Sequence, residues 1–385
     1  MLKEKSNIIN VVGFVDISYS WGPAIHFVEV WNEYSLLSNY KLIGYGILEK
    51  NKRPYTKLFF SFTPMIIKNR TSKVVRRIKK TVYDIYLFGL FMFCKKTIIY
   101  IRKSSFGIFM LLALYLRNHR LFIEVNGLAK EDQVNQINKN NIYRIAFFKL
   151  MEWLYLKLPN ASIISVSKNI SSILKRRYKI KKVFTISNGC SQRLLDIFES
   201  RRPLINNSIN IGYLGTFTPW DGHEKTDELY EACKNLDRSI KFHIAGTDVK
   251  NTILYKKYAT NKDFTFYDSI HYHDLAKFYK KLDAAYVFYR FDRHKNVEVS
   301  PLKVLEYWAS KIPILCTAIK GTEFIKNYNI GYLIKESEYS DKVKFNRAVE
   351  KFFGSIDKYV NNYQIAPKPR TWKDVAQNTK LLIET

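Results

Sequence analysis

The stretch Asn296–Thr317, NVEVSPLKVLEYWASKIPILCT, changes within a few residues from a polar approach to an amphipathic helix and then to a short apolar run. Ser300 is the predicted N-cap, because its hydroxyl can accept a hydrogen bond from a first-turn amide, and Pro301 suits the first helical position. The apolar run after Pro313 predicts a strand over 314–317. The stretch is therefore expected to form a loop, a helix and a strand in succession.

The first turn of this helix has the features of an anion-binding site. It contains Leu302 and Lys303 and no carboxylate. Unpaired amides, the positive end of the helix dipole and an ammonium group therefore converge on whatever lies in front of the helix. A phosphate group is the simplest ligand for this arrangement.

Two carboxylates flank the same helix start. Glu298 precedes the helix and Glu306 lies about a turn and a half inside it. Such carboxylates could bind hydroxyl groups, and a nucleotide sugar carries a diphosphate between ribose and sugar hydroxyls. On spacing alone, a surface helix with two solvated acids is the simpler interpretation, because charge placement is a weak guide to function.

The acid pair also carries a resemblance. Glu298, seven intervening residues, Glu306, the sequence Tyr-Trp-Ala and a strand led by proline resemble the acid pair of family 4 glycosyltransferases. The resemblance implies the GT-B fold and transfer with retention of anomeric configuration. It also implies that Glu298 faces the donor sugar and that Glu306 faces the ribose of the nucleotide.

Strand and helix patterns alternate along the chain, which predicts an α/β fold with two Rossmann-like domains facing each other across a cleft. We expect an acceptor-side domain over 1–198, a linker over 199–210, a nucleotide-sugar-binding domain over 211–366 and a terminal helix over 367–385 that crosses back to the first domain. Expected strands in the first domain are 8–17, 40–47, 58–62, 85–87, 97–101, 121–125, 161–166 and 183–186. Expected strands in the second are 209–214, 240–245, 264–267, 284–289, 314–317 and 331–334.

Two strand ends in the first domain are candidates for the acceptor side, because ligands of open α/β sheets bind at the carboxyl ends of strands. Gly22 and Ala24 belong to a small-residue loop expected over 18–24, which resembles the glycine-rich loop of family 4 enzymes. Glu124 and Asn126 belong to an E-x-N-G strand end that also resembles this family, with the Gly127 amide beside them. A strand that simply ends in a turn is the alternative.

The loop 215–222 is expected to approach the donor diphosphate from the second domain, with Gly215 and Thr216 at its start. Comparable loops of the family carry an arginine and a lysine where this chain has Thr216 and Asp221. Phosphate charge would then be neutralised by Lys303, by Arg290 at the end of the strand 284–289, and by backbone amides.

The positive net charge of the chain indicates a polyanionic partner. The chain has 63 Lys and Arg against 34 Asp and Glu, a net charge of +29. Nucleic acid and the inner face of a membrane both fit this excess, and a solvated basic surface is a third interpretation. Basic clusters beside aromatic residues in the first half favour an enzyme that reaches a lipid-borne acceptor. We therefore expect a cytoplasmic protein, peripheral at the inner face of the plasma membrane, with an undecaprenyl-linked glycan as acceptor.

No motif predicts a metal ion or a redox cofactor. The sequence has no Asp-x-Asp motif and no P-loop, and the histidines at 271 and 273 have no further ligand at metal-binding spacing except Asp274. Its four cysteines are scattered, which fits a reducing compartment. His26, at the start of a helix expected over 25–37, is expected on the helix surface.

These observations predict a retaining glycosyltransferase that moves a sugar from a nucleotide-sugar donor to an acceptor glycan in the synthesis of a capsule, O-antigen or similar polymer. Lys303 and Arg290 would stabilise the leaving diphosphate, and Glu298 would orient the donor sugar rather than attack it. Two alternatives remain. One is an inactive GT-B subunit that supports a partner enzyme, and the other is a basic nucleic-acid-binding α/β protein.

Overall fold

A computed structural model of the chain describes residues 8–19, 22–68, 72–102, 107–128, 142–201, 208–217, 222–291 and 301–385. The chain divides into two units, one of Met1–Asn188 with Trp372–Thr385 and one of Gly189–Thr371. The change of unit therefore falls before the linker expected over 199–210, and the helix Gln192–Ile197 belongs to the second unit.

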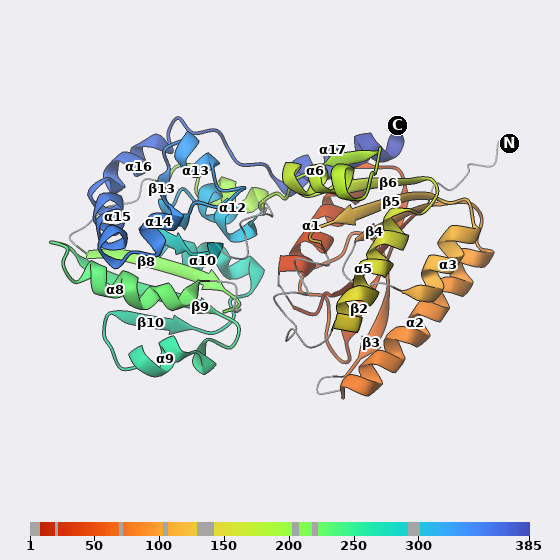
Figure 1. Cartoon of the computed structure of the whole chain (residues 1–385), viewed down its shortest axis with the longest axis horizontal. Helices are drawn as coiled ribbons and strands as arrows, with labels where there is room; N and C mark the ends of the chain where they lie inside the picture. Colours follow the sequence, from red (N-terminus) through yellow and green to blue (C-terminus); the bar gives the residue numbers. More distant parts are fainter. Residues whose placement is uncertain are drawn as a thin grey trace. The chain divides into compact units, whose positions relative to one another are not determined.

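The first unit is built on a seven-stranded parallel sheet with the order β3-β2-β1-β4-β5-β6-β7 (Figure 1). Its strands are β1 Ile8–Asp16, β2 Lys41–Glu49, β3 Ser61–Ile67, β4 Ile98–Arg102, β5 Arg120–Val125, β6 Ala161–Ser165 and β7 Val183–Thr185. Its helices are α1 Gly22–Leu37, α2 Lys73–Phe93, α3 Ile108–Leu116, α5 Ile142–Leu156, α6 Lys168–Arg177 and α17 Trp372–Glu384.

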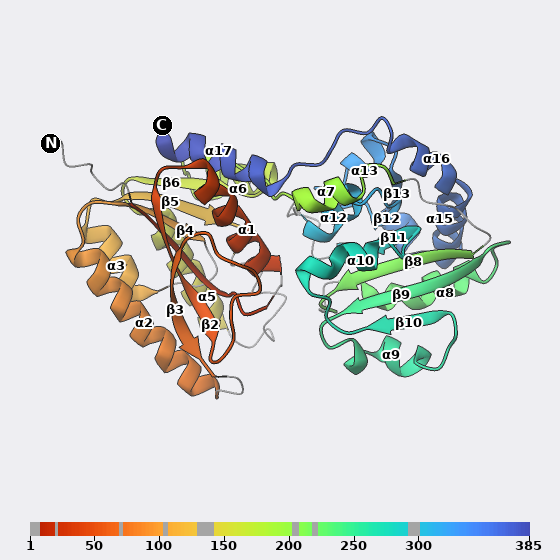
Figure 2. The ribbon, with the colours of Figure 1, turned by 180° about the vertical axis from the view of Figure 1, so that it is seen from behind.

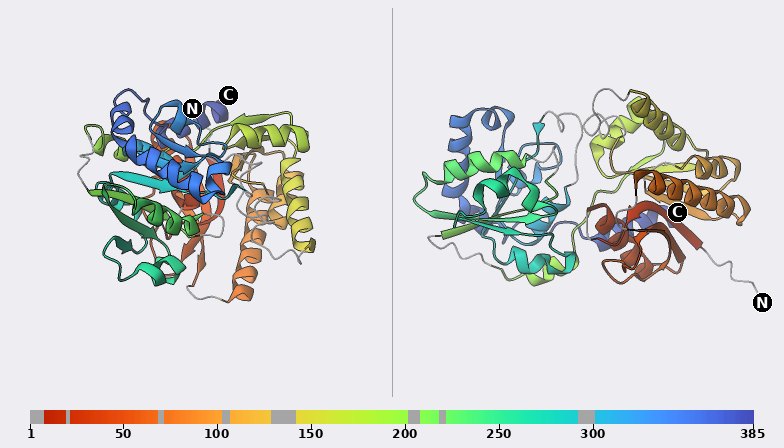
Figure 3. Two further views of the ribbon diagram at one scale, coloured as in Figure 1. Left: turned by 60° about the vertical axis from the view of Figure 1, so that its left-hand side comes forward. Right: turned by 90° about the horizontal axis from the view of Figure 1, so that it is seen from below.

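Helices cover both faces of this sheet. Crossover connections between parallel strands are right-handed. Helices in crossovers that move toward one edge of the sheet therefore lie on one face, and those that move toward the other edge lie on the opposite face. The helices α2, α3 and α5 lie on one face, and α1 lies on the other together with α17 (Figures 2 and 3). The terminal helix therefore returns to the first unit, as the sequence predicts.

The second unit contains a six-stranded parallel sheet with the order β10-β9-β8-β11-β12-β13. Its strands are β8 Ser208–Gly215, β9 Ser239–Gly246, β10 Phe264–Tyr267, β11 Ala284–Val287, β12 Ile314–Thr317 and β13 Gly331–Ile334. Its helices are α7 Gln192–Ile197, α8 Thr226–Cys233, α9 Ile253–Tyr258, α10 Leu275–Tyr279, α12 Leu302–Ala309, α13 Phe324–Asn327, α14 Glu336–Tyr339, α15 Lys342–Gly354 and α16 Ile356–Asn362. Short 3-10 turns lie at His223–Lys225, Val249–Asn251 and Tyr272–Asp274.

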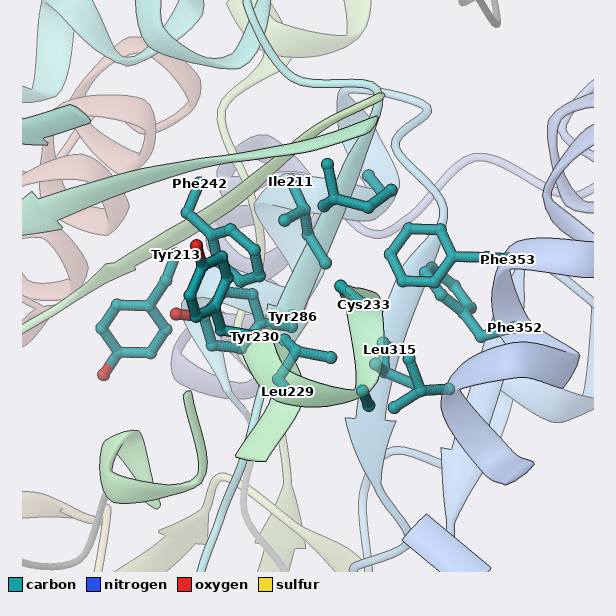
Figure 4. Packing of buried hydrophobic residues seen from close by; sticks show 14 of the residues in the cluster. Ile211, Tyr213, Leu229, Tyr230, Cys233, Phe242, Tyr286, Leu315, Phe352 and Phe353 are labelled. Atoms are coloured by element: carbon teal, nitrogen blue, oxygen red, sulfur yellow. The ribbon is translucent and has the colours of Figure 1, made fainter. Parts of the chain in front are cut away.

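The core of the second unit is unusually rich in aromatic rings. Figure 4 shows rings from β8, β9 and β11 packed with residues of α8 and α15. Phe242 and Phe264 stack with their centroids 4.8 Å apart, and Tyr230 meets both edge-on. Aromatic pairs of this geometry add to the free energy gained from burial alone. The core therefore fixes the strands whose carboxyl ends carry the candidate site.

Three local expectations are wrong. The strand expected over 85–87 is part of α2, whose apolar residues recur at helical spacing. The helix α1 begins at Gly22, so Gly22 and Ala24 lie in its first turn and not in a loop. The helix α12 begins at Leu302, and Pro301 occupies the N-cap position without a side-chain hydrogen bond.

The strand orders define one switch point in each sheet, where successive crossovers turn toward opposite edges. These points lie between β1 and β4 in the first unit and between β8 and β11 in the second. Ligands of open α/β sheets bind at the carboxyl ends of strands beside such points. Within the described ranges, no helix combines the length and apolarity needed to cross a bilayer.

Candidate active site

In the second unit, two glycines allow the ends of β8 and β9 to approach closely. Gly215 and Gly246 are register partners. A Cβ atom on Gly246 would lie 1.8 Å from the Gly215 carbonyl oxygen, and one on Gly215 would lie 2.3 Å from the Tyr213 hydroxyl. A larger residue at Gly246 would therefore displace the backbone, and one at Gly215 would displace the Tyr213 side chain, at the point where the sequence predicts the donor phosphates.

Aromatic rings position Lys303 beside the switch point. Its Nζ lies 4.8 Å from the ring centroid of Tyr213, on β8, and 5.9 Å from that of Tyr289, which follows β11. The Tyr213 hydroxyl is 3.5 Å from the same nitrogen, the upper limit for a hydrogen bond. Cation–π attraction to these two rings therefore holds the ammonium group at the ends of β8 and β11.

Glu306 is buried three residues further along α12. The Tyr279 hydroxyl donates a hydrogen bond of 2.8 Å to Oε2, and no described residue donates one to Oε1. Burial raises the pKa of Glu306 to about 7, although the Tyr279 hydrogen bond and the Lys303 charge each oppose this shift. The carboxylate therefore has one oxygen left for a ligand hydroxyl.

A tyrosine fixes α12 against the end of β8. The backbone amide of Leu214 donates a hydrogen bond of 3.0 Å to the Tyr307 hydroxyl. The Tyr307 ring also meets the Tyr279 ring edge-on, with the centroids 5.4 Å apart. Tyr279 and Tyr307 therefore position Glu306 and Lys303, although neither was singled out in the sequence. The sequence signal that could have found them is a tyrosine placed to face a buried acid, and this is weak evidence because the facing segments are distant in the chain.

The remaining donor-side residues divide into two groups. Arg290 and Thr216 are exposed immediately after β11 and β8, at the same edge of the sheet as Lys303. Glu298 and Ser300 lie outside the described residues, so their predicted roles stay predictions. The structure thus brings together Gly215, Lys303 and Glu306.

In the first unit, Glu124 is the centre of a buried polar cluster. Glu124 on β5 is the register partner of Arg102 on β4, so the two side chains share one face of the sheet. Arg102 Nε lies 3.3 Å from Glu124 Oε1, and the Tyr100 hydroxyl donates a hydrogen bond of 2.6 Å to Oε2. Asn126 Nδ2 donates a bond of 2.6 Å to Oε1.

His26 completes this cluster and is buried, contrary to the expectation of a surface histidine. Its Nε2 lies 3.1 Å from Glu124 Oε1, and its Nδ1 lies 2.7 Å from the Asn188 side-chain oxygen. The Trp372 ring of α17 packs edge-on against the imidazole. The error arises because α17 and the end of β5 cover this side of α1, and these contacts join segments far apart in the sequence.

The cluster keeps Glu124 charged. Burial raises the pKa of this carboxyl, but His26, Arg102 and the Tyr100 hydroxyl together hold it well below its usual range. Donors or cations already contact both oxygens of Glu124. We infer that Glu124 positions His26 and Asn126 rather than accepting a proton. The acceptor-side roles of Glu124 and Asn126 stay predictions, as do those of Gly22 and of Ala24, whose side chain is fully buried.

The comparison with known families concerns the second unit. Residues 197–363 match the family model of glycosyl transferases group 1. The second unit is a glycosyltransferase domain. The expectation that the chain is a glycosyltransferase is thereby confirmed. No curated protein sequence matches the chain.

Solved structures confirm the GT-B fold. The sucrose-phosphate synthase from Thermosynechococcus elongatus matches with a TM-score of 0.70 at 13% identity, covering 98% of this chain and 98% of that one. WaaG, a glycosyltransferase involved in lipopolysaccharide biosynthesis, matches with a TM-score of 0.70 at 12% identity, covering 97% and 99%. HepE from Anabaena, in complex with UDP and glucose, matches with a TM-score of 0.64 at 12% identity, covering 98% and 99%.

Glu124→Gln is expected to lower the free energy of unfolding by about 3 kcal/mol at pH 7, because it leaves the buried Arg102 guanidinium without its carboxylate. The folded pKa of Glu124 lies below its unfolded value, so its contribution is present above about pH 4.5 and is lost as the pH falls further. Thermal unfolding at pH 7 and pH 4 measures both effects. The exposed substitution Glu350→Gln is the control, and equal stability of the two variants would contradict the analysis.

Glu306→Gln is expected to have the opposite effect at alkaline pH. The folded pKa of about 7 exceeds the unfolded value of 4.5, so the wild-type protein loses stability as the pH rises through this window. Glutamine can still accept the Tyr279 hydrogen bond and carries no charge. The variant should therefore be more stable than wild type at pH 8, by at most about 3 kcal/mol, and similar at pH 4.5. Parallel pH profiles for the two proteins would show that the Glu306 pKa is not raised.

Proposed function

We propose that the chain is a retaining glycosyltransferase that transfers a sugar from a nucleotide-sugar donor to a hydroxyl group of an acceptor glycan. The observation that carries this proposal is the pairing of Lys303 with the half-satisfied carboxylate of Glu306 at one sheet switch point. Lys303 offers charge for a diphosphate, and the open oxygen of Glu306 offers an acceptor for a ribose hydroxyl.

In the proposed reaction, the bond between the anomeric carbon and the diphosphate breaks while the acceptor oxygen bonds to the same face of the sugar. The acceptor proton passes to the departing phosphate oxygen. Lys303, Arg290 and backbone amides would stabilise the negative charge that develops on the diphosphate, which is commonly the largest catalytic contribution. Glu298 would hold the donor sugar hydroxyls, and Glu306 the ribose.

We also propose that the acceptor is a lipid-linked glycan, of the undecaprenyl type, used for a surface polysaccharide. The enzyme would then work as a peripheral protein at the cytoplasmic face of the plasma membrane. The excess of Lys and Arg over Asp and Glu supports an anionic surface as partner. WaaG is described as acting in lipopolysaccharide biosynthesis, and HepE was solved with UDP and glucose, which makes UDP-sugars the first donors to test.

A thermal-shift screen against UDP, GDP, ADP, CMP and their sugars tests the donor site. A nucleotide at a hundredfold excess over its Kd should stabilise the protein by about 2.7 kcal/mol. Lys303→Ala and Glu306→Ala are expected to lose this shift, because they remove the diphosphate and ribose contacts. Lys326→Ala and Glu350→Ala change the same residue types elsewhere in the second unit and should keep it.

The same screen separates the alternatives. If no nucleotide stabilises a folded protein, the chain is better explained as an inactive GT-B subunit that supports a partner enzyme. Salt-dependent binding of arbitrary DNA without any nucleotide response would favour a nucleic-acid-binding protein. A shift that survives in both Lys303→Ala and Glu306→Ala would move the donor site elsewhere.

Donor binding is expected to need no metal ion, because side-chain cations and helix amides would carry the diphosphate charge. The thermal shift with the selected nucleotide sugar should be the same in excess EDTA and in millimolar Mg²⁺. A shift that EDTA abolishes and Mg²⁺ restores would contradict this part of the proposal.

A further inference from the structure

The outer side of α2 is apolar along its whole length. Val74, Ile78, Val82 and Ile85 are exposed, and their spacing places them on one stripe of the helix. Phe93 extends the stripe with 85% of its side chain exposed. The opposite side of α2 is the one that packs into the unit, through Tyr83, Leu87 and Phe91. Helix α2 is therefore apolar on two sides, and only one of them is covered.

Two neighbouring helices continue the same exposed apolar surface. Helix α3 packs against α2 and also contacts α5, and all three cover the same face of the first sheet (Figure 3). Exposed apolar residues recur at helical spacing on both: Ile108, Leu112 and Tyr115 on α3, and Tyr143, Phe147 and Leu150 on α5. We call the outer side of these helices the α2–α3–α5 face. Exposed apolar side chains that recur on three adjacent helices are typical of an interaction site.

The charges on the α2–α3–α5 face have a single sign. Within these helices the acidic residues are Asp84 and Glu152, and both are buried. Asp84 accepts hydrogen bonds from the amides of Phe109 and Met110, and Glu152 accepts one from the Tyr178 hydroxyl. The exposed charged residues on and beside the three helices include Arg76, Arg77, Lys95, Lys96, Arg117 and Lys149. The face is therefore both apolar and basic.

We propose that the α2–α3–α5 face docks onto the surface of an anionic lipid bilayer, with its aliphatic and aromatic side chains among the acyl chains and its Lys and Arg at the headgroups. An apolar stripe flanked by cations matches the interfacial region of such a membrane in both respects. The inference rests on the proposed function, because it supplies the surface by which the enzyme would reach a lipid-linked acceptor.

The positive charge and apolar character of the α2–α3–α5 face argue against other binding partners for it. A second copy of the chain would bring the same cations to the same face, and like charges would oppose its association. Nucleic acid would satisfy the cations, but it offers no apolar phase for Val, Ile and Leu side chains. The Asp84 hydrogen bonds join α2 to the start of α3, so the face exists before any lipid is bound.

Sedimentation with phospholipid vesicles tests the docking, using the full chain and no donor or acceptor. We expect binding to vesicles of 70% phosphatidylcholine and 30% phosphatidylglycerol at low salt, and little binding to pure phosphatidylcholine. Arg76→Glu with Arg77→Glu should lower the partition coefficient at least about twentyfold, since each basic side chain near an anionic surface is worth a factor of about five. Lys256→Glu with Lys262→Glu changes the net charge equally in the second unit and should have a much smaller effect.

The apolar part of the face is tested without any change of charge. Ile78→Ser with Val82→Ser should lower the partition coefficient about tenfold. Ile253→Ser with Val343→Ser alters side chains of the second unit that are at least as exposed, and it should leave binding unchanged. Trp153 is half exposed on α5, so its fluorescence should be quenched by phosphatidylglycerol with brominated acyl chains. Trp153→Phe should remove that part of the quenching.

Several results would overturn the proposal. The first is a failure to bind the anionic vesicles. The second is an equal loss of the partition coefficient in the face variants and in the control variants. The third is that brominated phosphatidylglycerol does not quench the fluorescence of Trp153. A dimer in lipid-free solution that Ile78→Ser with Val82→Ser dissociates would assign the face to a second copy. Nucleotide thermal shifts measured in parallel separate the two proposals. Vesicle binding without any nucleotide thermal shift would contradict the proposed function and support the docking face. A nucleotide thermal shift without vesicle binding would support the proposed function and contradict the docking face.

Discussion

Parallel strands can be joined only by crossovers, and this constraint organises both units. The crossover helices bury both faces of each sheet, so the strands are apolar on both sides and the polar groups are left at the strand ends. Glu124 lies near the end of β5 and Asn126 follows it, Gly215 ends β8, and Lys303 lies in the first turn of α12. The polar groups that could contact a ligand therefore lie at the carboxyl ends of the strands, whatever reaction the chain performs.

The same constraint explains why the outer sides of the helices differ. A crossover helix needs one apolar side to cover its sheet, and water is the usual neighbour of its other side. In the second unit the crossover helix α8, between β8 and β9, follows this rule, with Leu229, Ala232 and Cys233 buried and Glu231 exposed. Helices α2, α3 and α5 do not follow it, since their outer sides are also apolar. Sheet packing does not account for these exposed apolar side chains, and the proposed docking face is assigned to them for that reason.

The sequence predicts the parallel architecture and most strands, because buried parallel strands are short apolar runs with clear ends. It fails over 85–87, where the two-sided apolar pattern of α2 locally resembles a buried strand. It also selects Lys303 and Glu306 as candidate site residues from their local spacing, and the structure places both on α12. It misses His26, Arg102, Tyr213 and Tyr279, because their importance depends on strand register and on helix packing between distant segments. Long-range contacts of this kind leave no periodic pattern in the chain.

The two buried carboxylates illustrate what the structure adds. Glu124 and Glu306 are similarly buried, so desolvation raises the pKa of both. Glu124 is surrounded by an imidazole, a guanidinium, a hydroxyl and an amide, and its pKa falls well below the usual range. Glu306 has one hydroxyl donor and a more distant ammonium, and its pKa rises to about 7. A buried carboxylate that its own protein leaves half satisfied gains most from a ligand that donates hydrogen bonds, because those bonds replace the lost hydration. By this criterion Glu306 suits the ribose contact that we propose for it, and Glu124 suits a role in holding its neighbours in place.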